Sequence, residues 1–266
     1  IGNTALGYKA LLSNTTANDN TALGNQTLTF NNTGYSNTAV GRFALYSNTT
    51  GYENVAVGIN ALQLNIVGNN NVAVGNGAML NNTASYNTAL GSVALYNNTI
   101  GSANTALGGA TLLQNTTGYG NTAVGYSALR VNIGGYDNTA TGSGALQNNT
   151  TGNYNTAHGV GALANLVSGS FNTCVGKDAG LPPGPNPSNF SAFGYGAGWV
   201  GSNTNTIEIG NTSVSYIGGQ VGWSSFSDAR IKREVQEDIP GLLFINQLRP
   251  VSYRFDTHKQ NQMVYG

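Results

Sequence analysis

Side chains able to do acid–base, nucleophilic or metal chemistry are rare in this chain. Only 20 of its 266 residues are charged, and it has two histidines and one cysteine. The single thiol, Cys174, allows no internal disulfide and no cysteine-based metal site. Ser227, Asp228 and Lys232 lie close together. By residue type alone they are typical of a helix start, with a capping serine, an acidic first turn and a solvated lysine.

The charge balance excludes several classes of function. Ten basic and ten acidic residues give a net charge of zero, which offers no attraction to nucleic acid or to an anionic membrane. No stretch approaches the roughly 20 apolar residues of a membrane span. Residues 1–226 hold five Asp or Glu and none recurs in register, so we do not expect the paired carboxylates of a glycan-cleaving site. We also expect no cofactor and no metal ion.

A repeated motif organises the first two thirds of the chain. Asn-(Thr/Val)-small-x-Gly occurs in eleven copies, spaced by 17 residues except for one step of 16. The copies start at Asn3, Asn20, Asn37, Asn54, Asn71, Asn87, Asn104, Asn121, Asn138, Asn155 and Asn172. Counting from this Asn, position 3 is Ala in every copy but the last, position 5 is always Gly, and positions 8 and 9 are commonly Ala-Leu. The short copy, 71–86, should lose its residue in the polar stretch that follows, because turns tolerate deletion.

Two short strand-like pieces per copy, each bounded by Gly or Asn turn residues, predict one coil of a parallel β-solenoid. Gly, Asn and Thr together make up 105 of the 266 residues and argue against a helical array. Stacking at the strand spacing of about 4.8 Å would turn every motif position into a column, and eleven coils would span about 50 Å. The position-1 Asn should form a ladder of side-chain amides. The position-5 Gly should mark a corner with positive φ or a close backbone approach.

Alternation along the strand divides the motif between two faces. Positions 3 and 5 carry almost only Ala and Gly, and we expect this smooth face to lie against another copy of the chain. One thin stack has about three sizeable apolar side chains per coil, so oligomerisation should supply the missing core. His158 occupies position 4 on the other face, next to Thr141 of the preceding copy. Three such imidazoles at a symmetry axis could bind an anion or a metal, but an exposed or hydrogen-bonded histidine is the simpler interpretation.

The motif Asn-Thr-Ala-Val-Gly-x-x-Ala-Leu, as at 121–129, resembles the head repeat of trimeric autotransporter adhesins of the YadA type. The resemblance covers about residues 3–180. It implies a left-handed β-roll with three-fold symmetry, exposed on a bacterial surface and binding host matrix or other cells.

The composition changes after the last copy. Residues 181–187 carry four of the six prolines and cannot continue a hydrogen-bonded ladder. Strand-like segments follow, so we expect 1–180 to be the repeat rod and 181–226 a Pro-rich loop with a terminal β cap or neck. Residues 227–266 hold eleven of the twenty charges and predict a separate, short α+β segment that opens with an amphipathic helix.

This last segment carries a second resemblance. Phe-Ser-Asp-Ala-Arg-Ile-Lys at 226–232, followed by Leu-Arg-Pro-Val-Ser-Tyr at 248–253, resembles the opening of the endosialidase-type intramolecular chaperone domain. Domains of this family end phage tail fibres and bacterial surface proteins, drive trimerisation of the fibre before them and then cut themselves off. The resemblance implies that Ser227 is the nucleophile and Lys232 its general base, with Asp228 beside them and the cut next to Ser227. A lysine can be such a base only when burial lowers its pKa.

We therefore predict a homotrimeric β-solenoid fibre that is extracellular, on a bacterial surface or a phage particle, and that attaches to a glycan or protein receptor. Apart from single-turnover self-cleavage we expect no enzymatic activity. One alternative is an ice-binding solenoid, suggested by the position-2 threonines and interrupted at Val55 and Val72. The other is the shaft of a glycan-degrading tail spike. The chain begins at Ile1 in the middle of a motif, so we expect a fragment or a processed product.

Overall fold

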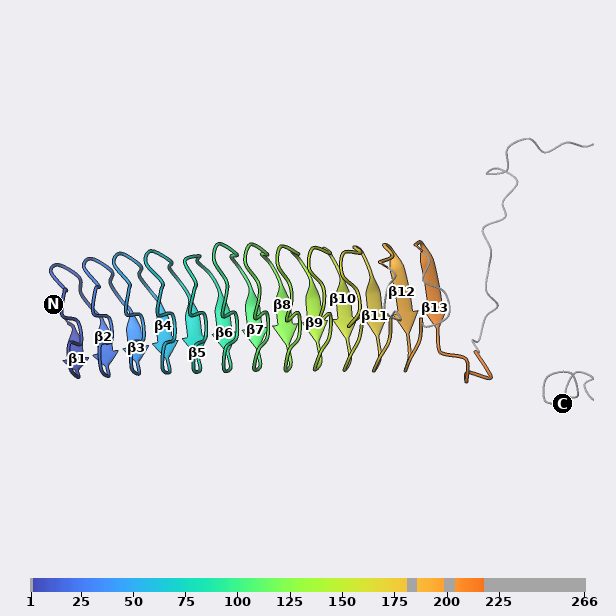
Figure 1. The fold of residues 1–266 in the computed structure, drawn as a ribbon, viewed down its shortest axis with the longest axis horizontal. Coiled ribbons are helices and arrows are strands. Elements are labelled where there is room, and N and C mark those ends of the chain that lie inside the picture. Colours follow the sequence, from blue (N-terminus) through green and yellow to red (C-terminus); the bar gives the residue numbers. More distant parts are fainter. Residues whose placement is uncertain (1, 181–185, 199–203, 218–266) are drawn as a thin grey trace, which may run out of the picture. The chain divides into compact units, whose positions relative to one another are not determined.

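The computed structural model describes residues 2–180, 186–198 and 204–217, and in these residues the chain is an all-β solenoid. Thirteen short parallel strands, one per coil, pair in sequence order into a single sheet (Figure 1). The strands are β1 (Thr4–Leu6), β2 (Thr21–Leu23), β3 (Thr38–Val40), β4 (Val55–Val57), β5 (Val72–Val74), β6 (Thr88–Leu90), β7 (Thr105–Leu107), β8 (Thr122–Val124), β9 (Thr139–Thr141), β10 (Thr156–His158), β11 (Thr173–Val175), β12 (Phe190–Phe193) and β13 (Thr206–Ile209). They belong to one compact unit, Ile1–Ser215.

The strands pair in a register that keeps every motif position in one column, as predicted. Ala22 pairs with Ala39, for example, and both are at position 3. The 16-residue copy keeps this register, because Val72 of β5 pairs with Thr88 of β6. Its missing residue lies in the turn between Asn82 and Asn87, which confirms the predicted place of the deletion.

Two strands extend the sheet beyond the eleven motif copies. β12 pairs with β11, and β13 pairs with β12, both in parallel. Phe190 stands where an Asn would begin a twelfth copy, and its ring is fully buried. Its backbone N–H donates to Oδ1 of Asn172 at 2.9 Å, so the aromatic ring ends the column of amides without leaving that oxygen unpaired.

Each coil contains one strand, where the sequence predicted two. The segment after the position-5 Gly turns repeatedly, because residues at positions 7, 9 and 17 have positive φ; in the third coil these are Phe43, Leu45 and Glu53. Such a conformation costs a non-glycine residue about 1–2 kcal/mol. The backbone nevertheless keeps its bonds between coils, as from the Leu45 N–H to the Ala61 carbonyl at 3.0 Å. The chain must pass once around a narrow core in 17 residues, so it has to bend sharply. A second extended strand could not bend in this way.

The core lies inside each coil and consists of position 3 packed against positions 8 and 9. In the third coil these residues are Ala39, Ala44 and Leu45, and none is exposed. The predicted smooth Ala surface is therefore wrong as a contact face between copies, since position 3 points inward. The interior is too narrow for two large side chains to oppose each other, so Ala faces the Ala-Leu pair in coil after coil.

Two ladders of buried asparagines run through the stack. At position 1, Oδ1 of Asn37 accepts from the backbone N–H of Asn54 at 3.0 Å and from its side-chain amide at 3.1 Å. This confirms the predicted ladder. A second ladder, which the sequence interpretation missed, runs along position 12, where Nδ2 of Asn48 donates to Oδ1 of Asn31 at 2.7 Å. Both ladders also bond backbone carbonyls, so the buried amides replace a larger apolar core with hydrogen bonds.

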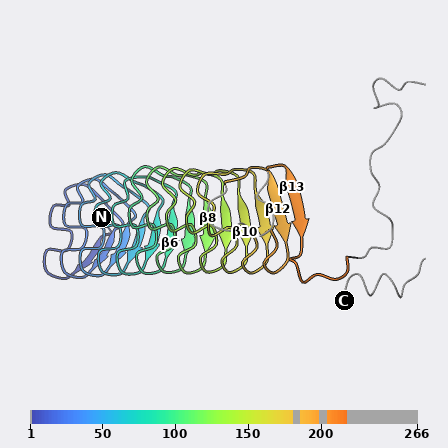
Figure 2. The same cartoon turned by 45° about the vertical axis from the view of Figure 1, so that its right-hand side comes forward.

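The position-5 glycines form the corner after each strand, as predicted. Gly58 has φ of +134°, and a Cβ built on it would lie 2.5 Å from the carbonyl oxygen of Gly75 in the next coil. Positive φ and close backbone approach both exclude a side chain at this corner. The strands thus form one side of the rod, and the turning segments form its other sides (Figure 2).

Candidate functional site

The outward side of the sheet, which we call the outer sheet face, is formed by positions 2 and 4 of every strand. Thirteen strands with two outward side chains each present 26 residues. Position 4 is Leu, Val, Phe or Ile in eleven strands, the exceptions being Thr141 and His158. The position-4 aliphatic and aromatic residues are Leu6, Leu23, Val40, Val57, Val74, Leu90, Leu107, Val124, Val175, Phe193 and Ile209.

The side chains of the position-4 column are exposed or half-buried, while the inward Ala beside them is buried in the strands after the first. Leu90 is 51% exposed, and its neighbour Ala89 is 0% exposed. None of the 26 outward residues is Asp, Glu, Lys or Arg. A sheet with one solvated face normally carries polar side chains there, and large exposed apolar surfaces mark interaction sites. This arrangement performs no acid–base chemistry, but it suits non-covalent association.

The size of the outer sheet face matches a protein interface. Thirteen strands at about 4.8 Å span about 58 Å. Its 26 residues fall within the range of about 20–30 residues that each partner contributes to a stable interface.

His158 lies on the outer sheet face and is exposed. It pairs in register with Thr141 of β9 and Val175 of β11, neither of which can ligate a metal strongly. Within the described ranges, no group of three or more His, Cys, Asp or Glu side chains could hold a metal ion. The exposed side chain agrees with the simpler interpretation from the sequence, and a cluster of imidazoles here would require other copies of the chain.

Cys174 takes the place of the inward Ala in β11 and is buried. Burial raises the pKa of its thiol to about 12, so the thiol is neutral near pH 7. It acts as a small apolar core residue.

The tyrosines that recur near the turn stack on one another. Tyr35 and Tyr52 have ring centroids 4.8 Å apart, as do Tyr119 and Tyr136, and both pairs are nearly parallel. These four rings therefore pack between neighbouring coils. Tyr86 shows no ring contact in the described part of the chain, because the neighbouring coils carry no aromatic residue at the corresponding places, which are Asn69, Asn70, Ser102 and Ala103.

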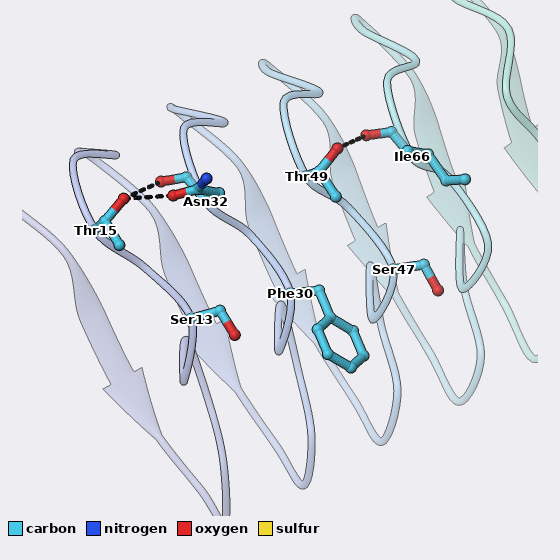
Figure 3. Close-up of a pocket in the computed structure, with 7 residues that line it drawn as sticks. All are labelled: Ser13, Thr15, Phe30, Asn32, Ser47, Thr49 and Ile66. Carbon is cyan, nitrogen blue, oxygen red and sulfur yellow. Dashed lines mark hydrogen bonds between the residues drawn. The ribbon is translucent and has the colours of Figure 1, made fainter.

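The structure contains an open groove that sequence reasoning missed. We call it the Phe30 groove (Figure 3). It has a volume of about 480 Å³ and is lined by residues at positions 11 and 13 of the first four coils: Ser13, Thr15, Phe30, Asn32, Ser47, Thr49 and Ile66. No single copy contains it, because it arises only when four coils stack. The one signal was the aromatic residue at a position that is otherwise polar or aliphatic.

Ser227, Asp228 and Lys232, the predicted self-cleavage residues, lie outside the described residues, as does the rest of 218–266. The proposed dyad therefore stays a prediction from resemblance. Within the described ranges, no helix is long and apolar enough to cross a membrane. Comparisons with protein-family models, curated proteins and solved structures found no match to this chain.

Proposed function

We propose that this chain is the rod of a homotrimeric extracellular fibre, on a bacterial surface or a phage particle, that mediates attachment. The observation that carries the proposal is the outer sheet face, a long uncharged strip with an exposed aliphatic column. In a lone chain this strip would stay in water at a cost that grows with every coil. Covering it with other copies of the chain removes that cost.

A second copy suits this strip because both repeat at the same spacing. Each coil advances by one strand, so aliphatic side chains of one copy meet those of another at every level of the rod. The number of copies, three, rests on the resemblance to trimeric adhesin heads and to chaperone-tipped fibres. In this proposal residues 227–266 open the trimerisation chaperone, and Ser227 and Lys232 perform the cut.

The test of assembly is the mass of the chain in solution. Multi-angle light scattering should give three times the chain mass of 27.4 kDa, and this mass should persist in mild denaturant. A mass of one chain would contradict the fibre.

The test of self-cleavage is separate. In the full-length protein, mass spectrometry should find a cut beside Ser227, and Ser227→Ala and Lys232→Ala should each abolish it. Equal cutting in the Ser227→Ala variant would exclude the dyad but would leave the fibre untouched.

Ice binding is a second candidate, because the position-2 threonines form a column in register on the outer sheet face. Nine of the thirteen strands carry Thr at this position, and Val55 and Val72 interrupt it. The same face cannot bind ice and be covered by other copies. Thermal hysteresis from a monomeric chain would favour this candidate, and its absence from a trimeric chain would dismiss it.

A further inference from the structure

The Phe30 groove combines an exposed aromatic ring with polar groups on both sides of it. Phe30 is 47% exposed and packs edge-on against Tyr46, with ring centroids 5.0 Å apart. Ser13 and Ser47 occupy the same motif position as Phe30 in the two neighbouring coils (Figure 3). Each neighbouring level of the rod therefore places a serine hydroxyl next to the level of the ring.

Several polar atoms in the groove are available to a ligand. The hydroxyls of Ser13 and Ser47 make no hydrogen bond with another described residue, and neither does Nδ2 of Asn32. Oδ1 of Asn32 accepts from the hydroxyl of Thr15, which fixes the orientation of the amide. The groove therefore offers two hydroxyls and one oriented amide donor around an aromatic ring.

No charged side chain lines the groove. The two cations in these coils are held elsewhere, since Lys9 lies over the ring of Tyr8 and Arg42 over the ring of Phe43. A charged ligand would find no counter-ion here. The groove is lined by turn residues and not by a strand, so an extended peptide would find no strand edge within it to pair with. A flat C–H face that stacks on an aromatic ring, bordered by neutral hydroxyls, is the chemistry of a neutral sugar.

We propose that the Phe30 groove binds a neutral saccharide, with one sugar ring on Phe30 and its hydroxyls bonded by Ser13, Asn32 and Ser47. This inference rests on the attachment function proposed above and names the receptor chemistry. The groove lies at positions 11–13, outside the strands, so covering the outer sheet face leaves it open.

A second groove farther along the rod serves as an internal comparison. It is lined by the same motif positions in coils five to eight, and its residues are Asn81, Asn97, Thr99, Gln114, Thr116 and Ile133. It contains no aromatic ring, and Nδ2 of Asn81 donates to Oδ1 of Asn97 at 2.9 Å. Because its amides bond each other and nothing stacks, this groove should bind sugar much more weakly.

The experiment is saturation-transfer NMR on the whole chain with cellohexaose, maltohexaose and mannohexaose as neutral probes and a hyaluronan hexasaccharide as a charged one. At least one neutral probe should be saturated. Phe30→Ala should weaken its binding about tenfold, the effect of losing one good aromatic stack. Asn32→Ala should weaken it less. Tyr126→Ala removes a ring outside the groove that is more exposed than Phe30 and should change nothing.

Three results would overturn the proposal: no saturation of any neutral probe, equal binding by the wild type and Phe30→Ala, or preference for hyaluronan. Circular dichroism of each variant shows whether the fold is intact, which we expect because Phe30 is half-exposed. Light scattering on the same samples separates the two proposals. Finding a trimer that binds no sugar would contradict only the saccharide site. Finding a monomer that binds sugar would contradict only the fibre.

Discussion

The inward and outward faces of each strand carry different types of residue, although the two faces alternate along the same short segment. The inward residue is Ala in every strand from β1 to β10 and Cys174 in β11. The outward residues vary among Thr, Val, Leu, Ile, Phe, Ser and His. Inside, the coils up to β12 must fit the same narrow space, so size decides the residue. Among the strands that the structure describes, only the end strand β13 departs from this, with Glu208 at the inward position. On the outer sheet face the side chains vary in size, yet none of them is charged.

That difference indicates two kinds of constraint. An outward face that met only water would be free to collect charged residues, as the turns of this chain do at Lys9, Arg42 and Glu53. The outer sheet face has none in thirteen strands. We infer that the inside is constrained by the coil itself and the outside by a partner. The predictions below test this division.

The largest effect is expected inside, at the first Asn ladder. Asn121→Leu removes the acceptor of the Asn138 N–H and the amide that bonds Asn104 and the Gly135 carbonyl. The buried N–H of Asn138 loses its acceptor, and about three further hydrogen bonds are lost. These losses should destabilise the coils by about 3–5 kcal/mol. Hydrogen exchange around β8 measures it. Thr122→Val, the next residue but outward, should change stability by less than about 0.5 kcal/mol; equal losses would break the comparison.

A smaller loss is expected at the corner. Gly108→Ala places a Cβ 2.7 Å from the Gly125 carbonyl oxygen at a φ of +135°, so it should cost at least about 2 kcal/mol. The matched control is Gly109→Ala, where the nearest atom would be 3.5 Å away and φ is not positive. Thermal unfolding should show a lower midpoint for the first variant alone. Tolerance of both would mean that the corner is looser than the structure indicates.

The tyrosine stacks should contribute less again. Tyr119→Ala removes a parallel stack with Tyr136 and should cost about 0.5–1.5 kcal/mol. Tyr126, which is 67% exposed, has no ring contact with any described residue, so Tyr126→Ala should be neutral. Denaturant unfolding of the Tyr119→Ala and Tyr126→Ala variants measures the two effects. Identical unfolding midpoints would show that the stack contributes nothing to stability.

The smallest effect near neutral pH is expected at Cys174. Its thiol pKa is raised to about 12, so the folded thiol stays protonated where an unfolded one, with a pKa near 9, begins to ionise. Its contribution to stability should therefore be complete below pH 9 and decline as the pH rises toward 12. At pH 8 a thiol reagent should modify the denatured chain quickly and the native chain very slowly. Rapid modification of the native chain would mean that the position-3 column, to which Cys174 belongs, does not lie in the core.

The repeat made much of the fold predictable. Asn54 and Gly58 recur at fixed spacing, so one physical argument for an amide ladder and a corner applied to every coil, and both were right. Alternation predicted two faces but could not say which points inward, because Ala suits a tight core as well as a smooth contact. The position-12 ladder and the positive φ of Leu45 were hidden in a polar turn and an ordinary Ala-Leu pair. The Phe30 groove needs four stacked coils, and its one signal within a single copy was the aromatic residue at position 11.

The most direct test of the account is the mass in solution of two single-charge variants. Val124→Asp places a carboxylate in the aliphatic column of the outer sheet face, while Ser143→Asp places one on an exposed turn beyond it. Analytical ultracentrifugation should find the wild type and Ser143→Asp as the same oligomer and Val124→Asp as a dissociated chain of 27.4 kDa with an unchanged circular dichroism spectrum. An oligomer that survives Val124→Asp and falls apart with Ser143→Asp would show that copies meet through the turns, and the division between the two faces would be wrong.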